Sequence, residues 1–186
     1  MKSAALIFAA LLPLGAQMAS RAVPAAPPPV AGTPTQKASK ISLSTLYGIE
    51  RNCDDKLKGI GEPNTVDLLG ATRGVYLDGY GTVFSAEMSL VTPPAIYPFH
   101  PQATKEDITS VHAKKLQRLP VLQTAMKEMM KAAAASLSSM PENQQIVLAV
   151  RLDNMKWEDT TGLPGMITIK ADRKSAQAGV FQVEIE

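Results

Sequence analysis

Few side chains in this sequence are of the types that catalyse reactions or bind metals. The chain of 186 residues has one cysteine, Cys53, and two histidines, His100 and His112. A cysteine and a histidine could act as nucleophile and base, but Cys53 falls on the apolar stripe of a predicted helix. Free cysteine is among the most buried residue types. The sequence therefore favours Cys53 as a small core residue, and excludes a disulfide framework within the chain.

The two histidines do not form a recognisable metal site. They lie twelve positions apart, and no H-E-x-x-H, H-x-E or H-x-x-H spacing supports them. Glu87, Glu106 and Asp107 are the conceivable further ligands, but a zinc site needs three or four ligands in fixed positions. We therefore predict no metal and no cofactor.

A catalytic centre is equally poorly supported. The sequence has no G-x-S-x-G nucleophile elbow and no Walker pattern. Asp153, Glu158 and Asp159 share a predicted loop with Lys156, and charged residues in such a loop are usually solvated surface. These observations argue against an enzyme.

Aromatic side chains in predicted loops and turns are the better lead. Rings in such positions bind partners at a low cost in conformational entropy. The alternative is that they cap the ends of the core. Together with one neighbouring histidine, the candidate binding residues are Tyr76, Tyr80, Tyr97, Phe99, His100 and Trp157.

The first 25 residues have the pattern of a secretory signal peptide. Lys2 precedes an apolar run, Ala4–Leu14, which is followed by small residues. The run is shorter than the roughly 20 apolar residues of a transmembrane helix. We therefore expect residues 1–25 to be removed, which leaves a periplasmic or extracellular protein without a transmembrane span. Residues 26–40, rich in Pro and Ala, are predicted to be a disordered linker.

The charge balance argues against nucleic acid as a ligand. The whole chain has 19 basic and 17 acidic residues. Without residues 1–25, which carry Lys2 and Arg21, the basic residues equal the acidic ones. A neutral chain lacks the basic surface that nucleic-acid-binding proteins need.

Residues 41–186 are predicted to form the single domain that positions these side chains. Apolar residues at helical spacing predict a helix over 42–58, with Ser42 as its N-cap. A longer stripe predicts a second helix over 104–140 that Pro120 kinks or divides. The stripe residues are Ile108, His112, Leu116, Leu119, Leu122, Met126, Met129, Ala133, Leu137 and Met140.

The remaining patterns predict strands. Apolar and polar residues alternate after Asp78-Gly79, a strong hairpin signal, so that one face of the sheet is dry and the other wet. A two-residue turn there would pair Arg73 with Phe84 on the dry face, and we expect a bulge at Gly70 or Gly74 to correct this. The predicted strands cover 65–77, 80–91, 145–152, 166–171 and 180–185, the last two joined as a hairpin. In the last two strands, the residues predicted to face inward are Ile167, Ile169, Phe181, Val183 and Ile185.

The order of elements predicts an α+β fold. It consists of an antiparallel sheet of about five strands with helices packed on one face.

Two segments resemble known sequences. RGVYLDGYGTVF (Arg73–Phe84) and WEDTTGLPG (Trp157–Gly165), with the helix between them, are similar to segments of uncharacterised exported bacterial proteins. The resemblance covers about residues 70–175 and implies export and a bacterial envelope setting. It carries over no catalytic residues.

The sequence thus predicts an exported, non-catalytic binding or envelope accessory module with an envelope protein as its partner. Two alternatives stay open. The first is a hydrolase with a cryptic site that uses His100, His112 and nearby carboxylates such as Glu87 or Asp159. The second is a structural subunit that self-associates through sheet edges or through the methionine-bearing helix.

Overall fold

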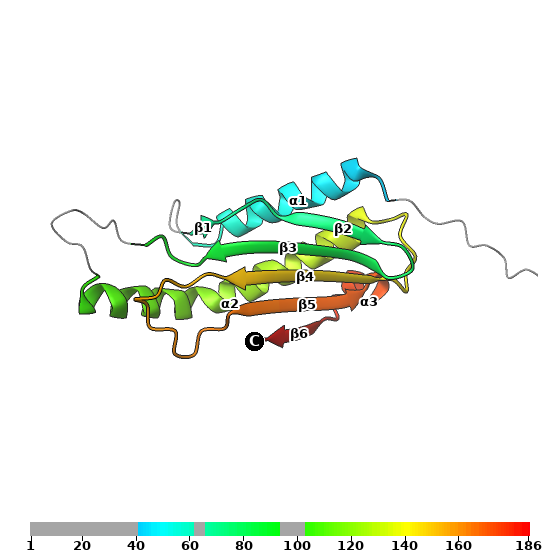
Figure 1. Ribbon diagram of the computed structural model, residues 1–186. Coiled ribbons are helices and arrows are strands. Elements are labelled where there is room, and N and C mark those ends of the chain that lie inside the picture. Colours follow the sequence, from blue (N-terminus) through cyan, green and yellow to red (C-terminus); the bar gives the residue numbers. More distant parts are fainter. Residues whose placement is uncertain (1–40, 62–65, 94–102) are drawn as a thin grey trace, which may run out of the picture. The chain divides into compact units, whose positions relative to one another are not determined.

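The computed structural model describes residues 41–61, 66–93 and 103–186, all within one unit, Lys37–Glu186 (Figure 1). The predicted signal peptide and linker lie outside the described residues. The helices are α1 (Leu43–Lys58), α2 (Lys105–Ser136) and α3 (Arg173–Ala178). The strands are β1 (Asp67–Leu68), β2 (Arg73–Leu77), β3 (Gly81–Ser89), β4 (Gln145–Leu152), β5 (Met166–Asp172) and β6 (Gln182–Ile185). The fold is α+β, as predicted.

Helix α1 begins where the sequence predicts. The Ser42 side chain accepts a hydrogen bond from the Thr45 amide at 3.1 Å, which satisfies one of the free N–H groups of the first turn. The stripe that follows is buried, at Leu46, Ile49, Cys53 and Leu57. Leu43, which the apolar spacing also assigns to this stripe, is 66% exposed and does not join the core.

The strands form one mixed sheet in the order β1-β3-β4-β5-β6, and β2 also pairs with β3. The central pair, β3 and β4, is parallel, while all other pairs of described strands are antiparallel. The prediction of a purely antiparallel sheet is therefore wrong. Helix α2 forms the long connection from β3 to β4, and a connection of this length lets the second strand run in the same direction as the first.

The turn between β2 and β3 has three residues rather than two. Leu77 pairs with Gly81, and the Tyr80 amide donates a hydrogen bond to the Leu77 carbonyl at 3.1 Å. The extra residue shifts the register by one, so Arg73 pairs with Ser85 instead of Phe84. The predicted correction by a bulge is wrong, because the turn itself moves Arg73 to the wet face.

Gly81 lies where β4 meets this turn. The Gln145 amide donates a hydrogen bond to the Tyr80 carbonyl at 2.8 Å. This bond holds the first residue of β4 against the turn between β2 and β3. Gly81 has a φ of 137°, and a Cβ atom there would overlap the Gln145 carbonyl oxygen. Only glycine fits this position without rearrangement.

Helix α2 is continuous through Pro120 for 32 residues. Of the two predicted effects of Pro120, a kink or a division, the division is wrong. Proline removes the hydrogen bond to the carbonyl four residues earlier, that of Leu116. Both Pro120 and Leu116 lie on the exposed side of the helix, where water can bind the freed carbonyl. Among the described helices, α2 included, none is long and apolar enough to cross a membrane.

The connection from β5 to β6 contains helix α3, where the sequence predicts a plain hairpin loop. Asp172 caps the helix by accepting a hydrogen bond from the Ser175 amide at 2.8 Å. Gly179 ends it with a φ of 79°, in the left-handed conformation that glycine favours.

Residues from α1, α2 and α3 pack with one set of alternating residues in β3, β4 and β5 to form the core. Phe84, Leu148 and Ile169 represent the three strands in this cluster. Residues on the same face of β6 do not join it. Val183 and Ile185, predicted to face inward, are 37% and 55% exposed, because none of the described helices extends over this strand.

Candidate functional site

A shallow hollow of about 400 Å³ lies on the face of the sheet that points away from the core. Its floor includes Ser85 of β3 and Ala149 of β4, which are direct neighbours in the parallel pair. Both side chains are small, so the floor is lower than its surroundings. Gly70 and Ala71 line one side, in the segment that leaves the sheet between β1 and β2, and Met166 of β5 lines the other.

Two arginines border the hollow. The Arg151 guanidinium lies 2.9 Å from a carboxylate oxygen of Glu87, its neighbour across the β3–β4 pair. Arg73 is exposed, and it has no ion-pair partner in the part of the chain that the structure describes. A free guanidinium presents forked N–H groups that suit a carboxylate or a phosphate. The hollow therefore combines a floor of small side chains with one unpaired cation.

A second constellation, around Lys115 of α2, is buried. The Lys115 ammonium donates hydrogen bonds to the Asp153 carbonyl at 3.2 Å, to the Asn154 side chain at 2.9 Å and to the Glu158 carboxylate. The side chains of Lys115 and Glu158 are each 2% exposed. An ammonium group has three N–H donors, and all three are used here. The amine is thus held as a cross-link between α2 and the loop after β4, and is not presented as a nucleophile.

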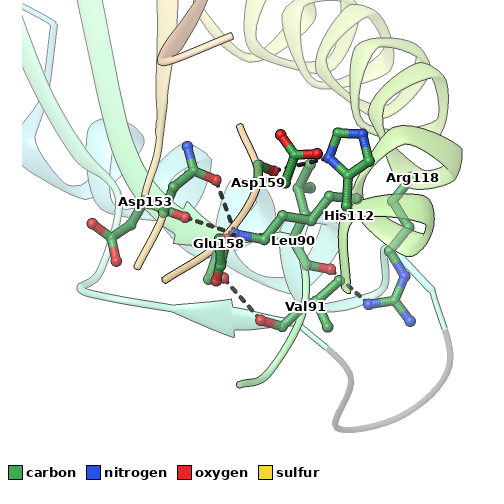
Figure 2. Close-up of polar contacts among 10 residues, drawn as sticks. Leu90, Val91, His112, Arg118, Asp153, Glu158 and Asp159 are labelled. Carbon is green, nitrogen blue, oxygen red and sulfur yellow. Dashed lines mark hydrogen bonds and ion pairs between the residues drawn. The ribbon is translucent and has the colours of Figure 1, made fainter. Parts of the chain in front are cut away.

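His112 lies one turn before Lys115 on α2 and contacts the same loop. Its Nδ1 atom is 2.9 Å from the Asp159 carbonyl oxygen. Figure 2 shows His112 and Asp159 next to each other. The Asp159 side chain accepts a hydrogen bond from the Thr161 amide at 2.9 Å. That bond is the main cause of a lowered Asp159 pKa, to which the neighbouring His112 adds a smaller effect. The ring and the carboxylate each have a structural partner in this loop.

The structure separates two of the predicted binding aromatics. Tyr80 is 46% exposed in the turn between β2 and β3, beside the start of β4. Half-buried Trp157 lies in the loop that follows the end of β4. Tyr76 is half-buried and donates a hydrogen bond from its hydroxyl to the Gln144 side chain at 3.1 Å. None of these three residues lines the hollow. Tyr97, Phe99 and His100 lie outside the described residues.

The carboxylates of the hydrolase alternative are also divided. Glu87 is on the outer face of the sheet, paired with Arg151, whereas His112 and Asp159 belong to α2 and the loop behind it. Within residues 41–61, 66–93 and 103–186, no group of three or more His, Cys, Asp or Glu side chains is arranged to hold a metal ion.

Cys53 is in the core, as predicted, at 2% exposure. Burial raises the pKa of its thiol to about 12, and the nearby carboxylates of Asp54 and Glu50 contribute to the rise. A thiol with this pKa stays protonated at neutral pH and is a poor nucleophile.

Sequence reasoning missed both polar constellations. In its turn of α2, Lys115 is buried and Leu116 is exposed. The sequence contains a pattern that indicates the burial of Lys115. Val111, Lys115, Leu122 and Met126 follow helical spacing, so one stripe passes through a lysine. The charged loop predicted to be solvated contains its buried partner, Glu158. The hollow had no such signal, because it depends on which residues of different strands become neighbours.

Comparisons with protein-family models, curated proteins and solved structures found no match to this chain.

Proposed function

We propose that this chain is an exported binding protein without catalytic activity, and that it binds its partner through the outer face of the sheet. In this proposal all helices lie on the core side, which leaves the outer face free. The hollow beside unpaired Arg73 carries the proposal, because it is an exposed concave surface with a definite chemical preference. Export rests on the pattern of residues 1–25 and on the resemblance to exported bacterial proteins.

The chemistry of the hollow favours a ligand with an anionic group beside an apolar portion. Arg73 would bind the anion, while Ala149 in the floor and Met166 beside it would take up the apolar portion. Arg151 is already paired with Glu87, so Arg73 is the guanidinium that can gain most from a ligand. An acidic side chain of an envelope protein, set among small apolar residues, matches these requirements.

Affinity capture from a bacterial envelope extract tests the proposal when it uses matched variants. The purified chain, Arg73→Glu and Arg51→Glu are immobilised separately, and the captured proteins are identified by mass spectrometry. Arg51 is an exposed arginine of α1, so its substitution changes net charge equally without altering the hollow. We expect specific partners on the unmodified chain and on Arg51→Glu, and their loss from Arg73→Glu.

A second variant tests the apolar part of the surface. Ala149→Leu fills the floor of the hollow while leaving Arg73 in place, and should reduce capture of the same partners. Identical capture by all variants would show that the hollow is not the binding surface. Export is tested separately, by the N-terminal sequence of the protein recovered from the envelope fraction, which should begin near residue 26.

A further inference from the structure

Among the described strands, β6 has a neighbour on one side only and leaves its other side as an open edge of the sheet. The amide and carbonyl of Glu186 both bond to Met166, with lengths of 3.0 and 3.1 Å. Hydrogen-bonded residues alternate along an antiparallel pair, so Glu184 and Gln182 also bond to β5. The backbone groups of Val183 and Ile185 therefore point away from the sheet. Such a row of unpaired groups is a template for another strand.

The side chains on this edge are apolar. Val183 and Ile185 are 37% and 55% exposed and lie on the face of the sheet that elsewhere forms the core. Half-buried Phe181 precedes them and contacts the core cluster. A strand added at this edge would extend the apolar face and cover these residues.

Side chains of α1 cover part of the opposite edge of the sheet. A Glu50 carboxylate oxygen accepts a hydrogen bond from the Gly74 amide at 2.7 Å, and an Asp54 oxygen accepts one from the Thr72 amide at 2.8 Å. These two side chains of α1 occupy N–H groups that an incoming strand would need. Of the two edges formed by the described strands, β6 is thus the more open to strand addition.

We propose that β6 pairs with β6 of a second copy of this chain, antiparallel, about a two-fold axis at Val183. The extent of β6 and its charges select this register. An axis at Gln182 would pair Ile185 with Gly179, which ends helix α3 and lies outside the strand. A two-fold axis at Glu184 would place two Glu184 carboxylates directly opposite each other, and an axis at Ile185 would oppose Glu184 with Glu186 of the other copy. Like charges in these positions destabilise a strand pair.

The axis at Val183 avoids both conflicts. With this axis, Val183 lies opposite Val183 of the second copy, Phe181 lies opposite Ile185, and Gln182 lies opposite Glu184. The charge of Glu184 is already balanced within each copy by its ion pair with Lys170. The apolar residues then lie together on the core side, and an amide faces a carboxylate on the other. The two sheets become one continuous sheet with equivalent halves.

Sedimentation velocity over a concentration series tests this pairing. The full chain should shift from monomer towards dimer as concentration rises. Val183→Glu should raise the dissociation constant at least about tenfold, because it places two carboxylates on the axis. The matched control is Val75→Glu on β2, where the side chain is 49% exposed, and it should dimerise like the unmodified chain. A monomer at every concentration, or equal loss in both variants, would overturn the proposal.

Cross-linking tests the register. Cα atoms of a hydrogen-bonded antiparallel pair are about 5.5 Å apart, within the range that a disulfide spans. Val183→Cys should therefore form a linked dimer on mild oxidation, while buried Cys53 does not compete. Faster linkage through Glu184→Cys would overturn the proposed axis. The protein could instead stay monomeric while the introduced thiol at position 183 resists alkylation. That result would overturn the dimer, because it would show that another segment of the same chain covers the edge.

Discussion

Lys115 and Glu158, 43 positions apart in the sequence, form an ion pair in which both side chains are 2% exposed. The pair joins the middle of α2 to the loop after β4. A buried pair of this kind adds little stability relative to an apolar pair of similar volume. Removal of one member, however, leaves the other as an uncompensated charge.

Lys115→Met should therefore destabilise the protein by about 3–5 kcal/mol, measured as the free energy of unfolding in urea. The double variant Lys115→Met/Glu158→Leu should recover most of that loss, because it leaves no buried charge. Lys114→Met alters the exposed neighbouring lysine and should change stability by no more than about 0.5 kcal/mol. Equal effects of the Lys115 and Lys114 substitutions would contradict the structural role of the pair.

Gly81→Ala should destabilise the protein by about 3 kcal/mol or more, since it combines a strained φ with overlap at the Gln145 carbonyl. Gly48→Ala is the control. Gly48 lies inside α1, and a Cβ atom there would meet nothing within 4 Å. The control should raise stability by about 0.5–1 kcal/mol, as alanine favours the helix. Thermal unfolding by circular dichroism measures both, and a neutral Gly81→Ala would contradict the close approach of β4.

Acid should weaken the cap of α3. The hydrogen bonds from the Ser175 amide and hydroxyl hold the pKa of Asp172 below its ordinary value of 3.8. A lowered folded-state pKa stabilises the native protein above the unfolded pKa, and this contribution is lost as pH falls through the folded pKa. The urea midpoint should fall below about pH 4, and less steeply in Asp172→Asn, which keeps an acceptor but does not ionise. Asp172→Ala should be less stable than Asp172→Asn even at pH 7. An unchanged acid slope in Asp172→Asn would contradict the role of this carboxylate.

The Cys53 thiol should be unreactive in the folded protein. Its pKa of about 12 and its 2% exposure leave neither thiolate nor access at pH 8. A chromogenic disulfide reagent should label it only after unfolding in urea. Leu43→Cys adds a thiol at a position that is 66% exposed and should react within the mixing time of a manual assay. Rapid labelling of the unmodified native chain would show that α1 opens locally.

The sequence predicts local elements of this fold well and their assembly poorly. Helix α1 and strand β4 occur within a residue of their expected bounds, because α1 has an unbroken helical periodicity and β4 is a nearly continuous apolar run. Strand β3 alternates in the way typical of antiparallel strands, so its sequence does not indicate the parallel pairing with β4. Arg73 was misplaced because one additional turn residue reverses the face of every side chain in a strand.

The candidate site depends on these long-range relationships. Ser85 and Ala149 are unremarkable in their own strands and form a floor only when the strands pair. Lys115 is visible as a charge on an apolar stripe, but its partner lies in another element. Residue types thus indicate where unusual side chains are, while the topology determines what they contact.

The central parallel pair also has a consequence for how the chain folds. Partners in β3 and β4 are 64 positions apart, from Gly81 with Gln145 to Met88 with Leu152. Contacts between residues close in sequence cannot form the central pair of the sheet. The entropy lost on closing so large a loop opposes the pairing of β3 with β4. Early formation of α2 would shorten this search, since a rigid rod replaces most of the flexible connection. The folding rate should therefore respond to helix propensity on the solvent side of α2, far from any strand.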